Sequence, residues 1–173
     1  PCLAGHGNLC ANWGATGDTV DGAFAEYVAV PAATCYRMPD EMTYQQGALV
    51  EPVSCAVHGV RRIGVEAGER FLVLGAGTMG LIMQQLLQRA GAVVTMVDRN
   101  TERLGRPREL GAAAVVADVA ELDDEKFDAA VDCTGAVPAI EAAFDSLRRG
   151  GRLLVFGVAP EEARVSLSPF RIY

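Results

Sequence analysis

Three closely spaced glycines and a later aspartate are the residues of this chain best suited to chemistry. Gly75, Gly77 and Gly80 follow an apolar stretch, and Asp98 ends the next apolar stretch. In the G-x-G-x-x-G spacing, the first glycine allows a tight turn and the second lets the backbone approach a pyrophosphate. The third lets a helix pack closely on a strand. A carboxylate about 20 residues further on accepts hydrogen bonds from ribose hydroxyls. The pattern therefore predicts a dinucleotide-binding site.

The residues around this turn suggest how the cofactor is held and which cofactor it is. A helix starting at Thr78 would direct free N–H groups and its positive dipole end at the phosphates, with Met79 beneath the pyrophosphate. Asp98 would repel a 2′-phosphate, so NAD is favoured over NADP. Arg99 and Arg103 oppose this preference, because arginine pairs well with phosphate.

Alternating strands and helices must position these residues. Apolar runs predict strands and amphipathic runs predict helices. The strands are 70–74, 93–97, 114–117, 127–132 and 151–157, and the helices are 78–90, 101–110 and 137–148. Such alternation builds an α/β fold with a doubly wound parallel sheet. A complete dinucleotide fold has about six strands, one more than is predicted here. Pro107 should kink or shorten the second helix.

The first part of the chain has a different pattern. After a loop-like start, alternation predicts a strand over 21–30 and a short one over 35–37, followed by two helical stretches. We expect residues 1–52 to belong to a β-rich domain and residues 53–173 to the nucleotide-binding domain. A last short strand is expected over 164–167.

Composition excludes several classes of partner. The net charge of −7 argues against nucleic acid and anionic membranes. No apolar run approaches the roughly 18 residues needed to span a bilayer. An odd number of cysteines makes a disulfide framework improbable and favours the reducing cytoplasm. The cysteines are Cys2, Cys10, Cys35, Cys55 and Cys133, of which Cys35 and Cys133 are expected in the core.

Several motifs together resemble one family. The run C-x-x-G-x-x-N-L-C from Cys2 to Cys10 resembles half of the structural-zinc lobe of zinc-dependent medium-chain alcohol and polyol dehydrogenases. GAGTMGL, D-x4-R-L and RRGGRLLVFGV follow in the family's order, and Glu51-Pro52 favours the sorbitol or polyol dehydrogenase branch. The resemblance implies a Rossmann domain with part of a GroES-like catalytic domain. It also implies that the N-terminal catalytic half and the C-terminal end are missing.

The resemblance also implies metal sites. Glu51 takes the position of a ligand of the catalytic zinc, while Cys2 and Cys10 belong to the structural zinc site. Two thiolates or one carboxylate cannot hold zinc tightly, so zinc is expected for the parent protein, and its presence on this chain is left open. Without the resemblance, Glu51 would be an ordinary acid at a helix N-terminus. His58 and Cys55 lie on the same helix face and are expected to be packing or pocket-shaping residues.

The activity implied by the resemblance is hydride transfer from a secondary alcohol or polyol to NAD. Arg103 would contact the adenosine ribose side, and Phe156, Gly157 and Val158 would line the nicotinamide. The strand over 164–167 would pair with its copy in a homodimer or homotetramer. The chain alone is expected to be inactive. The alternatives are a non-catalytic dinucleotide-binding module and a zinc-free relative similar to quinone reductases.

Overall fold

A computed structural model describes residues 2–124 and 126–172, except for the side chains of Cys2 and Asn8. The chain divides into two compact units, residues 1–43 and 44–173. The expected domain limits, 1–52 and 53–173, remain a prediction. Among the described residues, no helix is long and apolar enough to cross a membrane.

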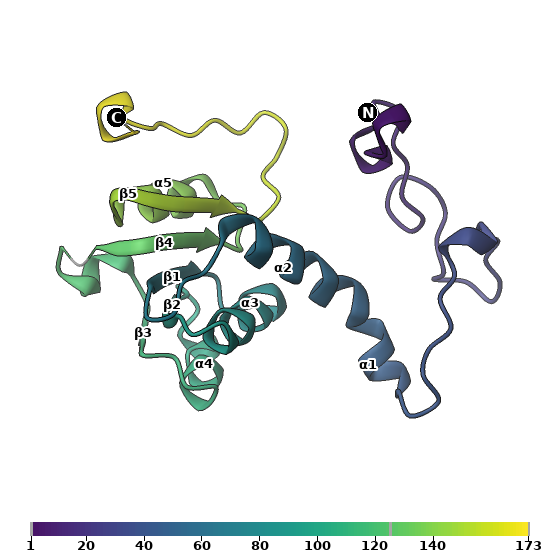
Figure 1. The fold of residues 1–173 in the computed structure, drawn as a ribbon, viewed down its shortest axis with the longest axis horizontal. Helices are drawn as coiled ribbons and strands as arrows, with labels where there is room; N and C mark the ends of the chain where they lie inside the picture. The colour runs from purple at the N-terminus through teal and green to yellow at the C-terminus, as the bar shows by residue number, and fades with distance from the viewer. Residues whose placement is uncertain (1, 125, 173) are drawn as a thin grey trace. The chain divides into compact units, whose positions relative to one another are not determined.

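The second unit is an α/β fold built on one parallel sheet (Figure 1). Its five strands run in the order β3-β2-β1-β4-β5, so the sheet grows outward in both directions from β1. The strands are β1 (Arg70–Leu74), β2 (Val93–Val97), β3 (Ala114–Val116), β4 (Phe127–Asp132) and β5 (Leu147–Val155). The helices are α1 (Tyr44–Ala48), α2 (Val50–Ile63), α3 (Thr78–Arg89), α4 (Gly105–Glu109), α5 (Val137–Asp145) and α6 (Pro169–Ile172). This confirms the predicted doubly wound Rossmann sheet.

The two faces of the sheet bury separate sets of side chains, because successive residues of a strand point to opposite sides. On β1, Phe71 and Val73 pack with apolar residues of α2 and α3. Leu72 and Leu74 point the other way and pack with residues of α5. Helices therefore cover both faces, which explains why the strands read as continuous apolar runs.

The register aligns the ends of the central strands. Leu74, the last residue of β1, pairs with Val97 of β2 on one side and with Asp132 of β4 on the other. Asp132 in turn pairs with Val155, the last residue of β5. The loops that leave these strands consequently start side by side at one edge of the sheet.

Proline explains one departure from the predicted elements. The helix expected over 101–110 is divided into a 3-10 turn (Thr101–Arg103) and α4. Because α4 begins at Gly105, Pro107 lies in its first turn, where a backbone N–H would have no helical partner. The carbonyl of the buried Pro107 accepts a hydrogen bond from the side-chain amide of Gln84 at 3.0 Å.

The strands expected over 21–30, 35–37 and 164–167 do not form, so these predictions were wrong. In the described part of residues 2–43 there are three 3-10 turns, Cys2–Ala4, Gly7–Leu9 and Ala32–Thr34, and an isolated bridge from Thr16 to Val20. None of the side chains described in this unit is buried. An alternating segment forms a strand only where a neighbouring strand pairs with its backbone N–H and C=O groups. The described residues of 2–43 include no strand that could do so.

Ion pairs tie the strands together at the opposite edge of the sheet. The carboxylate of Glu69 accepts hydrogen bonds of 2.6 and 2.7 Å from the guanidinium of Arg152 on β5. This contact, helped by the backbone N–H of Glu66, holds the pKa of Glu69 below its ordinary value. Asp128 of β4 accepts from the backbone N–H of Arg70 at 2.8 Å and pairs with Arg148, and the pKa of its carboxyl is lowered as well.

We expect Glu69→Gln to lower the free energy of unfolding by about 1–3 kcal/mol at pH 7, because a charge-assisted hydrogen bond is lost. The native pKa of Glu69 is depressed, so its contribution is present above the ordinary value of 4.5 and disappears as the pH falls through the native pKa. Urea unfolding at pH 7 and pH 3 measures both effects. The exposed variant Glu102→Gln is the control, and an equal loss for both variants at pH 7 would contradict the expectation.

Candidate functional site

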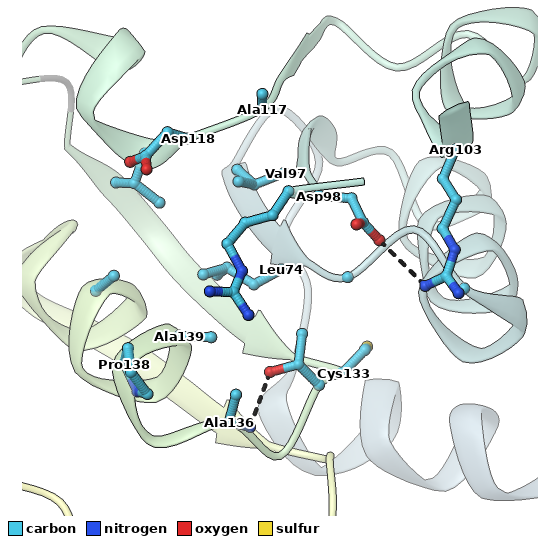
Figure 2. Close-up of a pocket in the computed structure, with 16 residues that line it drawn as sticks. Leu74, Val97, Asp98, Arg103, Ala117, Asp118, Cys133, Ala136, Pro138 and Ala139 are labelled. Carbon is cyan, nitrogen blue, oxygen red and sulfur yellow. Dashed lines mark hydrogen bonds and ion pairs between the residues drawn. The ribbon is translucent and has the colours of Figure 1, made fainter. Parts of the chain in front are cut away.

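A cleft of about 560 Å³ opens at the carboxyl ends of the strands (Figure 2). In an open parallel sheet, ligands bind where the strand order reverses, which here is between β1 and β4. The cleft is lined by Leu74, Gly75, Gly77, Val97, Asp98, Arg99, Arg103, Ala117, Asp118, Val119, Cys133, Thr134, Ala136, Pro138, Ala139 and Ala142.

The glycine turn after β1 has the geometry that its sequence requires. Gly75 has φ +102, a conformation that side chains disfavour. A Cβ on Gly80 would overlap the carbonyl oxygen of Gly75, so α3 can lie this close to the strand only with glycine there. Gly77 is the N-cap of α3 and provides no side-chain cap, which leaves backbone N–H groups of the first turn available. This end of α3 can therefore receive an anion.

Asp98, at the end of β2, is held by backbone donors. Its Oδ2 accepts from the N–H of Ala76 at 2.7 Å, and its Oδ1 accepts from the N–H of Asn100 at 2.8 Å. Arg103 lies beside it, with Nη1 3.7 Å from Oδ2 (Figure 2). Asp98 thus joins the second strand to the glycine turn and keeps a negative charge at the cleft.

The opposite wall of the cleft comes from the loops after β3 and β4, and sequence reasoning missed most of it. Asp118 caps a 3-10 turn (Val119–Leu122), its Oδ1 accepting from Ala120 N–H at 2.9 Å. After β4, Cys133, Thr134 and Ala136 line the cleft. The available signal was the run Asp-Cys-Thr-Gly at the end of a buried strand.

Cys133 lines the cleft rather than lying fully in the core, and Cys35, also expected in the core, is exposed. Burial raises the pKa of Cys133 to about 12, and the negative charge of Asp132 acts in the same direction. Since only the thiolate is nucleophilic, we expect this thiol to react slowly at neutral pH.

The structure brings together only part of the predicted cofactor set. Gly75, Gly77, Asp98, Arg99 and Arg103 all line the cleft. Residues 78–80 form the first turn of α3 just behind it. Residues 156–158 follow β5 and are not among the lining residues; a Cβ on Gly157 would overlap the N–H of Gly135 in the loop after β4.

The predicted metal ligands do not gather in the described residues. Glu51 lies exposed on α2, where its Oε1 accepts from the thiol of Cys55 at 3.0 Å. This hydrogen bond, with burial and the charge of Glu51, raises the pKa of Cys55. Cys10 is a half-buried free thiol, and the side chain of Cys2 lies outside the described part.

No group of three His, Cys, Asp or Glu side chains that could hold a metal occurs among the described residues. Zinc in proteins takes at least three such ligands. His58, on the same helix as Glu51, is exposed. The donors present therefore do not fit a zinc ion by themselves.

The fold and the cleft define a nucleotide-binding domain, and comparison gives the family. Residues 78–173, more than half of the chain, match the family described as zinc-binding dehydrogenase, so the chain belongs to that family. This agrees with the resemblance to zinc-dependent alcohol and polyol dehydrogenases.

Two of the relatives are named as polyol dehydrogenases, and a third is a solved structure of the same family. D-altritol 5-dehydrogenase of Agrobacterium fabrum is 37% identical over 99% of this chain and 53% of its own length. Human sorbitol dehydrogenase is 34% identical over 85% of this chain and 44% of its own length. A zinc-binding dehydrogenase of Sinorhizobium meliloti 1021, solved with NADP bound, is 34% identical with a TM-score of 0.90, over 99% of this chain and 54% of that one. The chain thus spans about half the length of these relatives.

We expect Gly80→Ala to destabilise the second unit by about 1–3 kcal/mol, because the new methyl must displace the Gly75 turn. Gly105→Ala is the matched control, since a Cβ there meets nothing within 4 Å. Thermal unfolding of both variants measures the difference. Equal stability of the two variants would show that the close contact between helix and turn does not matter.

We expect Cys133 to react with iodoacetamide at least ~100-fold more slowly than the exposed Cys35 at pH 8, because burial suppresses its thiolate. Peptide mass spectrometry after timed labelling gives the rate at each cysteine. Labelling in urea is the control and should remove the difference. Equal rates in the folded chain would contradict the raised pKa.

Proposed function

We propose that this chain binds a nicotinamide dinucleotide as part of a dehydrogenase that oxidises a small secondary alcohol or polyol. The observation that carries the proposal is the cleft at the strand ends, where the Gly75 turn, the start of α3 and the Asp98 carboxylate meet. Backbone N–H groups at a helix N-terminus suit a pyrophosphate, and the carboxylate suits ribose hydroxyls. Relatives named as altritol and sorbitol dehydrogenases support a polyol as the substrate.

Each part of the site takes a role in this proposal. The first turn of α3, with Thr78, Met79 and Gly80, binds the pyrophosphate, and Gly77 lets the backbone approach it. Asp98 accepts from the adenosine ribose, with Arg103 beside it. Residues 156–158 lie along the nicotinamide. When bound, the nicotinamide ring accepts the hydride of the alcohol.

We propose NAD rather than NADP as the preferred cofactor. Two backbone N–H groups fix the carboxylate of Asp98, so its charge cannot turn away from a 2′-phosphate. Against this stand Arg99 and Arg103, which line the same cleft and offer positive charge. The relative from Sinorhizobium meliloti 1021 was also solved with the phosphorylated cofactor, NADP, bound. Asp98 is held by two backbone donors and is largely buried, whereas the Arg103 side chain is about half exposed, so we weigh the carboxylate more heavily and propose NAD.

The catalytic part of the proposal rests on Glu51. Its carboxylate is a suitable zinc ligand, but the described residues supply only the neighbouring Cys55 as a second donor. We propose that Glu51, and likewise Cys2 and Cys10, contribute to ligand sets that other parts of the protein complete. If they are not completed, the chain is a non-catalytic dinucleotide-binding module. Assembly as a homodimer or homotetramer remains a proposal. The strand over 164–167 that was expected to pair with its copy does not form, so this proposal rests on the family resemblance alone.

We expect the chain to bind NAD at least ~10-fold more tightly than NADP, since one good charge-assisted interaction is worth about that much. Asp98→Asn should bring the two affinities within about threefold of each other, because it removes the charge that repels a 2′-phosphate. The amide keeps one acceptor oxygen for Ala76 but turns its nitrogen toward the N–H of Asn100, so both affinities should also fall. Isothermal titration calorimetry measures both constants.

Asp118→Asn is the matched control, since Asp118 lines the opposite wall of the same cleft, and it should leave the NAD preference unchanged. Equal binding of both cofactors to the wild type would overturn the NAD preference, and no binding at millimolar cofactor would overturn the proposed site. The complete gene product, assayed for NADH formation with a panel of polyols, tests the catalytic proposal.

A further inference from the structure

A buried carboxylate lies at the point where the strand order reverses. Asp132 is the last residue of β4, and its side chain is fully buried. It pairs with Leu74 of β1 on one side and with Val155 of β5 on the other. None of the ion pairs within the described residues involves Asp132. A carboxylate without water or a cation is unfavourable unless hydrogen bonds replace its hydration.

Every described partner of this carboxylate is a donor from the next loop. Its Oδ1 accepts from the backbone N–H of Thr134 at 2.9 Å and from the Thr134 hydroxyl at 2.6 Å. Its Oδ2 accepts from the backbone N–H of Gly135 at 3.0 Å. The backbone carbonyl of Asp132 also accepts from the N–H groups of Phe156 and Gly157, both at 2.9 Å. One residue therefore fixes the loop after β4 and the segment after β5.

The loop that Asp132 holds contacts both ends of the proposed cofactor site. Thr134 lines the cleft, and its methyl group lies 3.0 Å from the position of a Cβ on Gly75, at the glycine turn. The Thr134 hydroxyl accepts from the N–H of Ala136, which also lines the cleft (Figure 2). A Cβ on Gly135 would overlap the carbonyl oxygen of Val158, so this glycine packs directly on the segment after β5. The Asp132 side chain therefore holds the loop that packs against both segments.

We propose that Asp132 is a positioning residue that sets the affinity of the cleft for its cofactor, an inference that rests on the proposed dinucleotide site. It acts by holding Thr134 and Gly135 in place between the glycine turn and the segment over residues 156–158. Because Asp132 is fully buried and lies outside the cleft lining, it does not touch the cofactor itself.

Asparagine cannot replace this aspartate without disturbing the loop. An amide has one acceptor oxygen and one donor nitrogen, whereas three donors converge on the two oxygens of Asp132. With the amide oxygen toward Thr134, its nitrogen faces the N–H of Gly135, and the two donors repel each other. Asp132→Asn, which is nearly identical in size, therefore tests the hydrogen bonds rather than the packing.

The experiment compares Asp132→Asn with Asp128→Asn in the chain. Asp128 lies on the same strand near its other end and also accepts from a backbone N–H, that of Arg70. Asp132→Asn should raise the dissociation constant of NAD about tenfold or more, measured by calorimetry at a temperature where thermal unfolding shows each variant to be folded. Asp128→Asn should lose thermal stability and keep the wild-type dissociation constant.

A second pair of variants decides the case if Asp132→Asn does not fold. Thr134→Val removes the hydroxyl that binds Asp132 and keeps the methyl, whereas Thr134→Ser keeps the hydroxyl. The valine variant should weaken NAD binding about threefold or more, and the serine variant, which restores the hydroxyl, should bind NAD more tightly than the valine variant. Where Asp132→Asn folds, the double variant with Thr134→Val should lose less NAD affinity than the product of the two single effects, because both changes break the same hydrogen-bond network.

The outcomes separate this inference from the proposed function. Wild-type NAD affinity in Asp132→Asn, or in Thr134→Val where the first variant does not fold, overturns the role of Asp132 and leaves the cofactor site intact. Equal weakening by Asp132→Asn and Asp128→Asn also overturns it, because the effect would then be general. Failure of the wild-type chain to bind NAD or NADP overturns both proposals.

Discussion

The close approach of α3 to the end of β1 is the contact on which the rest of the structure depends. The carbonyl of Gly75 occupies the space where any other residue at position 80 would place its Cβ. This contact fixes where α3 starts, and therefore which backbone N–H groups face the cleft. Asp98 then links the second strand to the same turn through the N–H of Ala76. The position of the cleft residues on this side thus follows from the backbone contact between Gly75 and Gly80.

The sequence predicted the elements that rest on local pattern and burial. β1, β2 and β4 form over the residues expected for them, because each is an apolar run buried on both faces. The strands expected over 21–30, 35–37 and 164–167 failed for a common reason. Alternation shows which side chains could share a face, but a strand needs a second backbone, and pairing between distant segments leaves no mark on a single sequence.

The candidate site divides in the same way. The wall that carries Gly75, Gly77 and Asp98 follows from a motif with fixed spacing, and the structure places these residues together. The facing wall, with Thr134 and Ala136, is specified by a buried carboxylate whose role appears only when its donors are seen. Before folding, Asp132 is one more acid after an apolar run, and neither composition nor periodicity distinguishes it from Asp98.

All residues that line the cleft lie between Leu74 and Ala142, within the second unit. Every residue that lines the proposed nucleotide cleft is thus carried by one unit of the chain. A chimera that joins this unit to a different partner domain would keep these lining residues, and substrate specificity could change without altering them.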